Sequence, residues 1–199
     1  MQKTTSYMVL ISEVFDFTNQ QYIKNIFLVL VGSAILFLSS KFRVHIGPVP
    51  FSMQTLAVLL LGCILGWKLG VLTVFAYLFE GALGLPVFAG TPEKGIGLAY
   101  MMGPTGGYLV GFLLGAGITG FLAERGWDRN CFWMVIAMLL GNIAIYVPGL
   151  LWLGNLVGYS AAIEFGFLPF LLGDLLKLLI AALLMPYIWK LVLSRKDNP

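Results

Sequence analysis

Charge and histidine are scarce in this chain. Only 11% of its 199 residues are charged, and His45 is the single histidine. Two cysteines, Cys63 and Cys131, lie far apart in apolar runs, so we expect neither a disulfide nor a metal site and interpret both as small core residues. The absence of a basic block argues against a nucleic-acid partner, and no G-x-x-x-x-G-K-[ST] loop is present to bind ATP.

Apolar residues dominate instead. They make up 59% of the chain, and its mean hydropathy of +0.93 is well above that of a soluble globular domain. The sequence therefore predicts an all-α integral membrane protein with a single membrane domain over 1–199. The first 21 residues lack the pattern of a cleaved signal peptide, so we interpret them as a cytoplasmic or interfacial lead-in. A helical bundle is expected over 22–190, followed by a cytoplasmic tail at 191–199.

Six apolar runs, separated by charged or Pro/Gly-rich breaks, predict about six membrane spans in one compact bundle. The second is short, and only Trp67 and Lys68 separate it from the third, so five spans are the alternative. With both termini cytoplasmic, eight basic residues fall inside and three (Lys41, Arg43 and Lys94) outside. This asymmetry favours that orientation in the cell (inner/cytoplasmic) membrane. The expected spans are 22–40, 51–66, 69–87, 101–123, 131–153 and 167–190.

Glycines recur every fourth residue along two stretches. Such stripes let helix backbones approach closely in lipid, where van der Waals packing replaces the hydrophobic effect. We expect tight helix packing here, and a gliding contact with a partner subunit is the alternative. The glycines are Gly62, Gly66 and Gly70, and Gly103, Gly107, Gly111 and Gly115.

Asp174 and Lys177 are the unusual pair, because they lie in the middle of the apolar run 167–189, close to its expected midplane. A charge at that depth costs at least about 2.5–3.5 kcal/mol, so it is normally paired and functional. Their i, i+3 spacing places both groups on one helix face. We expect the pair to bind a polar ligand, and a closed structural ion pair is the alternative.

Few other polar residues occur in the spans. Gln54 and Thr55 begin the second, Glu80 lies in the outer half of the third, and Asn142 and Tyr146 share a face of the fifth. Such residues serve either as ligand groups or as hydrogen bonds between helices, and Glu80 could pair with an outer charge.

Two outer loops are rich in proline and glycine. They cover 46–55 and 84–97, and the second continues to 103–108. Backbone of this kind at membrane depth is tolerated where protein buries it or a cavity wets it, which suits a lid over a pocket. Loops that only reverse the chain have the same composition.

These motifs together resemble the BioY family, the biotin-specific substrate-binding membrane components (S components) of energy-coupling factor (ECF) transporters. The resemblance runs from about Val44 to Lys177, and the ordered set is highly specific although any single dipeptide is weak. Its parts are Gly-Pro-Val-Pro with Gln-Thr at 47–55, Tyr-Leu at 77–78, Gly-Leu-Pro-Val-Phe-Ala-Gly at 84–90, Gly-Pro-Thr-Gly-Gly-Tyr-Leu at 103–109, Trp-Leu-Gly at 152–154 and Asp-x-x-Lys at 174–177.

The resemblance implies a six-helix, non-enzymatic protein without a cofactor, which binds biotin near the outer face. A transmembrane coupling subunit and ATP-hydrolysing subunits would drive release inward. Lys177 would bind the valerate carboxylate, and Asp174 would accept from the ureido N–H groups or hold Lys177 in place. Gly90 and Thr91 correspond to the lid. The remaining pocket residues that we expect are Gln54, Tyr108, Asn142 and Tyr146.

Two departures from the family pattern affect the lid and the docking surface. Thr91-Pro-Glu-Lys94 replaces the glycine-rich or amide-bearing sequence that often follows Phe-Ala-Gly. The first span also lacks an Ala-x-x-x-Ala stripe for docking on the coupling subunit, and its only small residues there are Gly32, Ser33 and Ala34.

Two other function classes compete with transport. A membrane enzyme could use Asp174 as a base, but no second intramembrane acid–base group accompanies it. A purely structural membrane subunit could carry the pair as a packed ion bridge.

Overall fold

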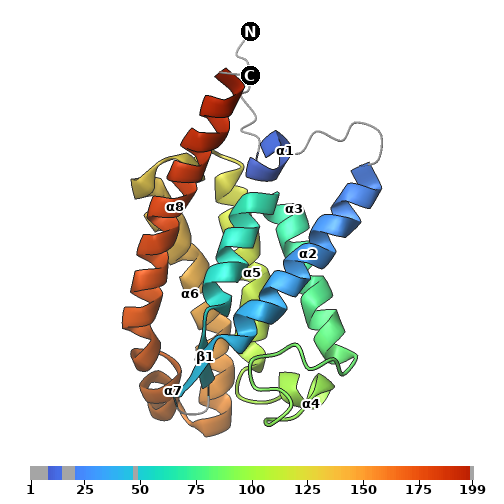
Figure 1. Ribbon diagram of the computed structural model, residues 1–199. Coiled ribbons are helices and arrows are strands. Elements are labelled where there is room, and N and C mark those ends of the chain that lie inside the picture. The colour runs from blue at the N-terminus through green and yellow to red at the C-terminus, as the bar shows by residue number, and fades with distance from the viewer. Residues whose placement is uncertain (1–8, 15–20, 47–48, 198–199) are drawn as a thin grey trace.

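The computed structural model describes residues 9–14, 21–46 and 49–197, and its long helices form one bundle (Figure 1). Within these residues, five segments are helical, long and apolar enough to cross a membrane. They are α2 (Gln21–Lys41), α3 (Gln54–Ala82), α5 (Gly106–Ala123), α6 (Cys131–Val157) and the segment Tyr159–Ser194, which joins α7 (Tyr159–Gly166) through the short 3-10 helix η2 (Leu168–Phe170) to α8 (Leu171–Asp197).

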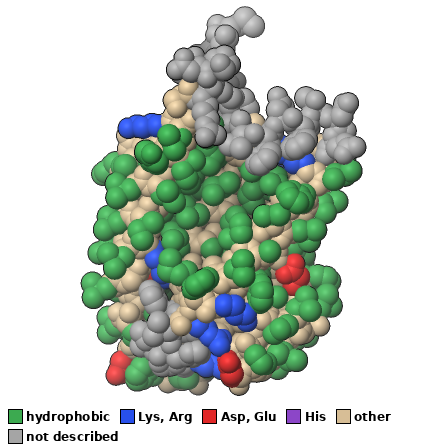
Figure 2. Space-filling view, viewed as in Figure 1, with side chains coloured by type: hydrophobic (Ala, Val, Ile, Leu, Met, Phe, Trp, Pro, Cys, Tyr) green, Lys and Arg blue, Asp and Glu red, His purple; other side chains and the backbone are tan. Residues whose placement is uncertain are grey.

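The outer surface of the bundle is apolar. Large side chains such as Phe27, Leu72, Val147 and Leu183 are exposed, and hydrophobic side chains cover most of the flank visible in Figure 2. Helices satisfy their own backbone hydrogen bonds, so they suit a medium without water. The molecule is therefore a multi-pass helical membrane protein, as predicted.

Helix α3 reverses its direction at Gly66. This residue has φ +80° and ψ 171°, a left-handed conformation that favours glycine. A Cβ on Gly70 would lie 2.9 Å from the Cα of Gly62, so the two halves of α3 pack backbone to backbone beside the turn. Their far ends also meet, because Gln54 Nε2 donates to Tyr77 Oη at 2.6 Å. The weak break between the second and third expected spans is thus a tight turn.

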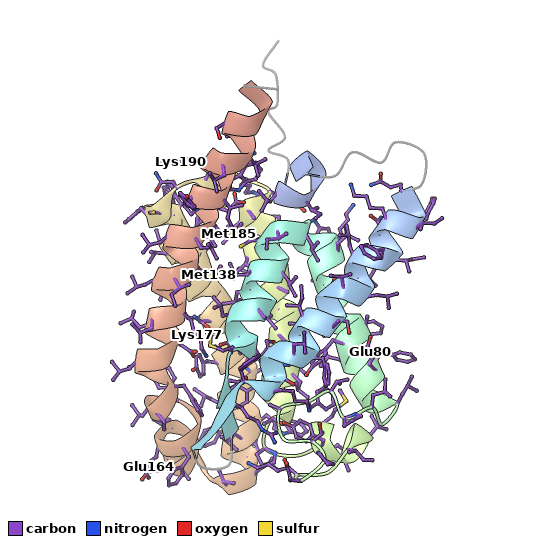
Figure 3. The ribbon with its side chains drawn as sticks, in the orientation of Figure 1. Glu80, Met138, Glu164, Lys177, Met185 and Lys190 are labelled. Atoms are coloured by element: carbon purple, nitrogen blue, oxygen red, sulfur yellow. The ribbon has the colours of Figure 1, made fainter. Side chains whose placement is uncertain are left out.

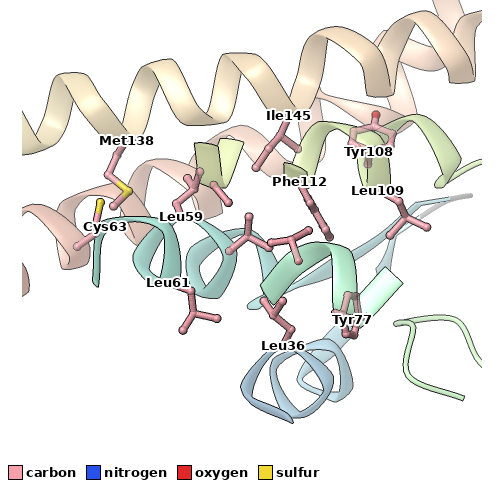
Figure 4. Packing of buried hydrophobic residues seen from close by; sticks show 14 of the residues in the cluster. Leu36, Leu59, Leu61, Cys63, Tyr77, Tyr108, Leu109, Phe112, Met138 and Ile145 are labelled. Carbon is pink, nitrogen blue, oxygen red and sulfur yellow. The ribbon is translucent and has the colours of Figure 1, made fainter. Parts of the chain in front are cut away.

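Helix α5 packs extensively against both α3 and α6. A Cβ on Gly111 would come within 2.6 Å of the Ile145 carbonyl oxygen, and one on Gly62 of α3 within 2.5 Å of the Ala116 carbonyl oxygen on α5. Phe112 and Ile145 belong to the buried cluster between these helices (Figure 4). The tight packing predicted from the glycine stripes is confirmed at these contacts.

A two-stranded antiparallel ladder interrupts the helical pattern. Strands β1 (Arg43–Ile46) and β2 (Val49–Ser52) pair so that Arg43 lies opposite Ser52. The sequence did not predict this ladder, and the expected second span begins at Gln54 rather than at residue 51. The physical reason is that α2 ends at Lys41 and short extended segments then return the chain to the bundle. The expected fourth span likewise begins at Gly106, after the separate helix α4 (Gly97–Met101).

Helix α2 turns two of its small residues inward. Gly32 and Ser33 are buried, and Ser33 Oγ donates to Glu80 Oε2 at 2.5 Å on α3. Ala34 is exposed. Two of the three small residues considered for docking therefore pack against this chain's own α3. Glu80, for which an outer charge was one possible partner, accepts a hydrogen bond from the Ser33 hydroxyl.

At the end of the bundle away from the β1–β2 ladder, α1 (Leu10–Val14) and the short 3-10 helix η1 (Trp127–Arg129) lie against the C-terminal part of α8 (Figure 1). Asp128 of η1 is fully buried and accepts a hydrogen bond from Trp189 Nε1 at 2.6 Å. The Arg129 guanidinium lies over the Trp189 ring, 4.2 Å from its centroid. Burial raises the pKa of Asp128 to about 6, partly offset by the hydrogen bond from Trp189 and the charge of Arg129.

Candidate functional site

A cavity lies within the bundle at the end where β1, α4 and α7 are found (Figure 1). The empty space between its walls, counted out to its open mouth, is about 570 Å³. Apolar groups form most of its wall, with a few polar groups among them. The lining residues are Val49, Ser52, Gln54, Thr55, Ala89, Tyr100, Thr105, Tyr108, Leu109, Phe112, Ile145, Tyr146, Phe170, Asp174 and Lys177.

Asp174 and Lys177 form a buried ion pair in this wall. Lys177 Nζ lies 2.9 Å from Asp174 Oδ1, and both side chains are less than one-tenth exposed. Thr55 Oγ1 donates to Asp174 Oδ1 at 3.3 Å, and Tyr146 donates to Asp174 Oδ2 through a short hydrogen bond. The two charges therefore pair with each other, and side chains of α3 and α6 donate further hydrogen bonds to the carboxylate.

All three N–H donors of Lys177 have partners in the protein. They are Asp174, the carbonyl oxygen of Ser52 at 2.6 Å and Thr55 Oγ1 at 3.0 Å. Asp174 has more capacity, since an ionised carboxylate offers about four acceptor sites and three are used by Lys177, Thr55 and Tyr146. The pair can therefore accept a hydrogen bond from one N–H group of a ligand more readily than it can donate a hydrogen bond to a ligand.

The pair occupies the first two turns of α8 instead of the middle of a long helix. Phe167 leaves helical geometry and η2 follows it, so α8 begins only at Leu171. Figure 3 shows Lys177 pointing into the bundle, well away from the Lys190 end of the same helix. The apolar run 167–189 in which the pair was noted therefore includes η2 as well as the first turns of α8. Near the N-terminus of a helix, Asp174 also benefits from the helix dipole.

Aromatic side chains form another part of the cavity wall. Tyr108 Oη donates to the carbonyl oxygen of Gly166 at 2.8 Å, and the Tyr108 and Tyr146 rings meet edge to face. Figure 4 shows Tyr108, Leu109 and Phe112 following one another on α5. Tyr108, Tyr146 and Gln54 were expected near the pair, and the structure brings all three to the same cavity.

The loop between α3 and α4 packs over the cavity, with Ala89 in the lining. Gly90 N donates to Tyr100 Oη at 3.1 Å, and Thr91 Oγ1 donates to the carbonyl oxygen of Phe88 at 2.7 Å. Gly90 and Thr91 are buried but do not line the cavity. Their hydrogen bonds hold the loop in its conformation. Burial raises the pKa of Tyr100, and its hydrogen bonds and the charge of Arg43 partly offset the rise.

Asn142 lies on the other side of the ion pair. It lines a small space behind Asp174 and Lys177, and also an apolar groove between α6 and α8. Its Oδ1 atom is buried and has no hydrogen-bond partner among the described residues. Asn142 therefore does not line the main cavity with Gln54, Tyr108 and Tyr146.

Several cavity residues were missed from the sequence. Ser52, Tyr100 and Thr105 gave no signal beyond their place in Pro/Gly-rich loops, and Thr55 was noted only as a polar residue at the start of a span. Three or more His, Cys, Asp or Glu side chains do not gather anywhere in the described part of the chain in a way that could hold a metal ion.

The bundle and its pocket define a class: a multi-pass membrane protein that encloses a small polar site in apolar walls. Comparison with known proteins narrows the class. A model described as the BioY family matches residues 6–194. The biotin transporter BioY of Thermotoga maritima is 40% identical over 166 residues, which cover 83% of this chain and 95% of that protein. The probable biotin transporter BioY of Pyrococcus horikoshii is 39% identical over 154 residues, covering 77% and 89%.

A solved structure agrees with these relatives. The crystal structure of the S-component for biotin from an ECF-type ABC transporter superposes with a TM-score of 0.74 at 28% identity, covering 88% of this chain and 95% of that one. The chain described here belongs to the BioY family.

Proposed function

We propose that this protein binds biotin and mediates its uptake as the substrate-specific component of an ECF-type transporter. The observation that carries the proposal is the Asp174–Lys177 pair, which is buried, hydrogen-bonded and exposed to a cavity in a chain whose named relatives are biotin transporters. Buried charge of this kind is costly in a membrane and is usually retained for function.

The chemistry of the cavity suits the bicyclic head of biotin. The remaining acceptor site on Asp174 fits a ureido N–H group, and Tyr108, Leu109 and Phe112 offer apolar surface for the sulfur-containing ring. The loop at 84–97 would close over the bound ligand. Gly90 and Thr91 would act as its braces and Asn142 as a group behind the pair.

The proposal includes the membrane topology and the partner subunits. The reversal at Gly66 divides α3 into two helical halves, which supports six spans in a single domain with both termini in the cytoplasm. The basic residues Lys24, Lys68 and Arg125 then lie at the cytoplasmic end. A transmembrane coupling subunit and ATP-hydrolysing subunits would supply the energy in the cell membrane.

A binding titration tests the proposal. Protein purified in detergent should bind biotin but neither thiamine nor riboflavin, and Asp174→Asn should weaken biotin binding at least tenfold. Thr73→Ser, a buried α3 substitution outside the cavity, is the matched control and should leave the affinity unchanged. Wild-type protein that shows no preference for biotin over the other two vitamins would refute the proposal.

A further inference from the structure

The carboxylate of biotin needs a positively charged partner, and the geometry of Lys177 leaves it poorly suited to that task. Its three donors already serve Ser52, Thr55 and Asp174, so a ligand carboxylate would have to displace one of them. It would also come close to the negative charge of Asp174, 2.9 Å from the ammonium nitrogen. Another cation near the cavity is the better candidate.

Arg43 is such a cation. It is the first residue of β1 and lies directly opposite Ser52, a cavity residue, in the β1–β2 ladder. Side chains directly opposite one another in an antiparallel pair lie on the same face of the sheet. The positive charge of Arg43 also acts on the hydroxyl of Tyr100, a second cavity residue. Figure 2 shows Lys and Arg side chains gathered with an acidic one at this end of the molecule.

The guanidinium of Arg43 has unused hydrogen-bonding capacity. Its Nη2 donates to Glu93 Oε2 at 2.7 Å, whereas its Nη1 is buried and has no partner among the described residues. A buried donor without a partner is destabilising, and more so when it is charged. The Arg43 side chain as a whole is 14% exposed, so water reaches it poorly. Such a group indicates a site for an anion.

Glu93 already places one carboxylate on this guanidinium. Its side chain is 65% exposed, and ion pairs with so exposed a partner contribute little to stability. Glu93 belongs to the Thr91-Pro-Glu-Lys94 stretch in which this chain departs from the family pattern. A ligand carboxylate could engage both terminal nitrogens of Arg43 at once, a geometry that guanidinium favours.

We propose that Arg43 binds the carboxylate of the substrate, and that Glu93 occupies this position in the empty protein and is exchanged for it when the substrate enters. This inference rests on the proposed function. Exchange of one carboxylate for another keeps the buried guanidinium neutralised throughout. It also couples the arrival of the substrate tail to release of the loop that carries Glu93.

Two ligands distinguish this role from a structural one. Biotin carries the carboxylate, whereas biotin methyl ester has the same ring system with an uncharged tail. Arg43→Gln should weaken biotin binding at least tenfold and change the affinity for the ester less than threefold. Glu93→Gln should tighten biotin binding between twofold and tenfold, because it removes the competing carboxylate. Lys94→Gln removes a neighbouring exposed charge and should have little effect on either ligand.

Each outcome decides between the assignments. Retained binding of the ester shows that the Arg43→Gln variant is folded. Equal weakening for biotin and its ester, or unchanged biotin binding, overturns the role of Arg43. Unchanged biotin affinity in Glu93→Gln overturns the exchange. Wild-type protein that binds neither ligand contradicts the proposed function itself, while biotin binding that ignores Arg43→Gln contradicts only this inference.

Discussion

Lys177 of the last helix donates a 2.6 Å hydrogen bond to the backbone carbonyl oxygen of Ser52, 125 residues earlier in the chain. This bond joins α8 to the end of strand β2, directly before α3 begins. The ammonium group therefore holds two distant parts of the pocket wall together, in addition to neutralising Asp174.

The first prediction concerns the coupling between Asp174 and Lys177. Removing one member of a buried ion pair leaves an uncompensated charge, which costs about 3–5 kcal/mol, whereas removing both leaves none. Asp174→Asn and Lys177→Met should each lower the melting temperature in detergent, and the double variant should be more stable than the sum of the two losses predicts. Strictly additive losses would show that the two charges do not interact.

Sequence patterns anticipated the charges better than their surroundings. A carboxylate and an amine in an apolar run are conspicuous, and their i, i+3 spacing is enough to predict the pair. Ser52 and Thr55 were out of reach, because their contacts with Lys177 join residues 125 and 122 positions apart. Periodicity within one helix carries no information about such distances.

The turn at Gly66 and the β1–β2 ladder show the same limit in the fold. A short apolar run ending at Gly66 was compatible with either five or six spans. The sequence does not show that Gly66 adopts a positive φ, or that Gly62 and Gly70 come into contact beside the turn. Strands of four residues are at the lower limit of a recognisable strand pattern, and Pro50 in one of them argues against a strand.

The second prediction concerns the contact between α5 and α6. A methyl group on Gly111 would meet the Ile145 backbone, which cannot move without shifting α6. Gly111→Ala should therefore lower the melting temperature by several degrees. Gly117→Ala is the matched control, because its Cβ would approach only a Val71 methyl group at 3.2 Å. Equal stability of the two variants would show that α5 and α6 are not packed this closely.

The third prediction concerns the pH dependence of stability. Burial raises the pKa of Asp128 to about 6 in the folded protein, from 3.8 when unfolded, so the folded state holds the proton more tightly. The resulting stabilisation is complete below about pH 4 and is lost as the pH rises through about 6. Its size is about 3 kcal/mol at most. Melting temperatures of the wild type should fall between about pH 4 and about pH 6 relative to those of Asp128→Asn.

The amide introduced by Asp128→Asn can still accept the hydrogen bond of Trp189, so the fold should be retained. Glu164→Gln, at an exposed position on α7, provides a control that should keep the wild-type pH profile. Parallel profiles of the wild type and Asp128→Asn would contradict the raised pKa.

The fourth prediction concerns topology. Cys131 begins α6 at the same end as Trp189 and is exposed, whereas Cys63 is buried. A membrane-impermeant maleimide should label the unmodified protein in inverted membrane vesicles and not in right-side-out ones. Cys131→Ser should abolish this labelling. Labelling restricted to right-side-out vesicles would place the α5–α6 connection outside the cell.

Tyr77 links the pocket wall to the loop that covers the pocket. Its hydroxyl accepts from Gln54 in the pocket wall and donates at 2.9 Å to the carbonyl oxygen of Val87, at the root of the loop that covers the pocket. Ser40 at the end of α2 donates to the same carbonyl at 2.7 Å. One carbonyl group at the start of the loop between α3 and α4 is therefore hydrogen-bonded both to α2 and, through Tyr77, to the Gln54 amide in the pocket wall, so three separate segments of the chain meet at a single backbone atom.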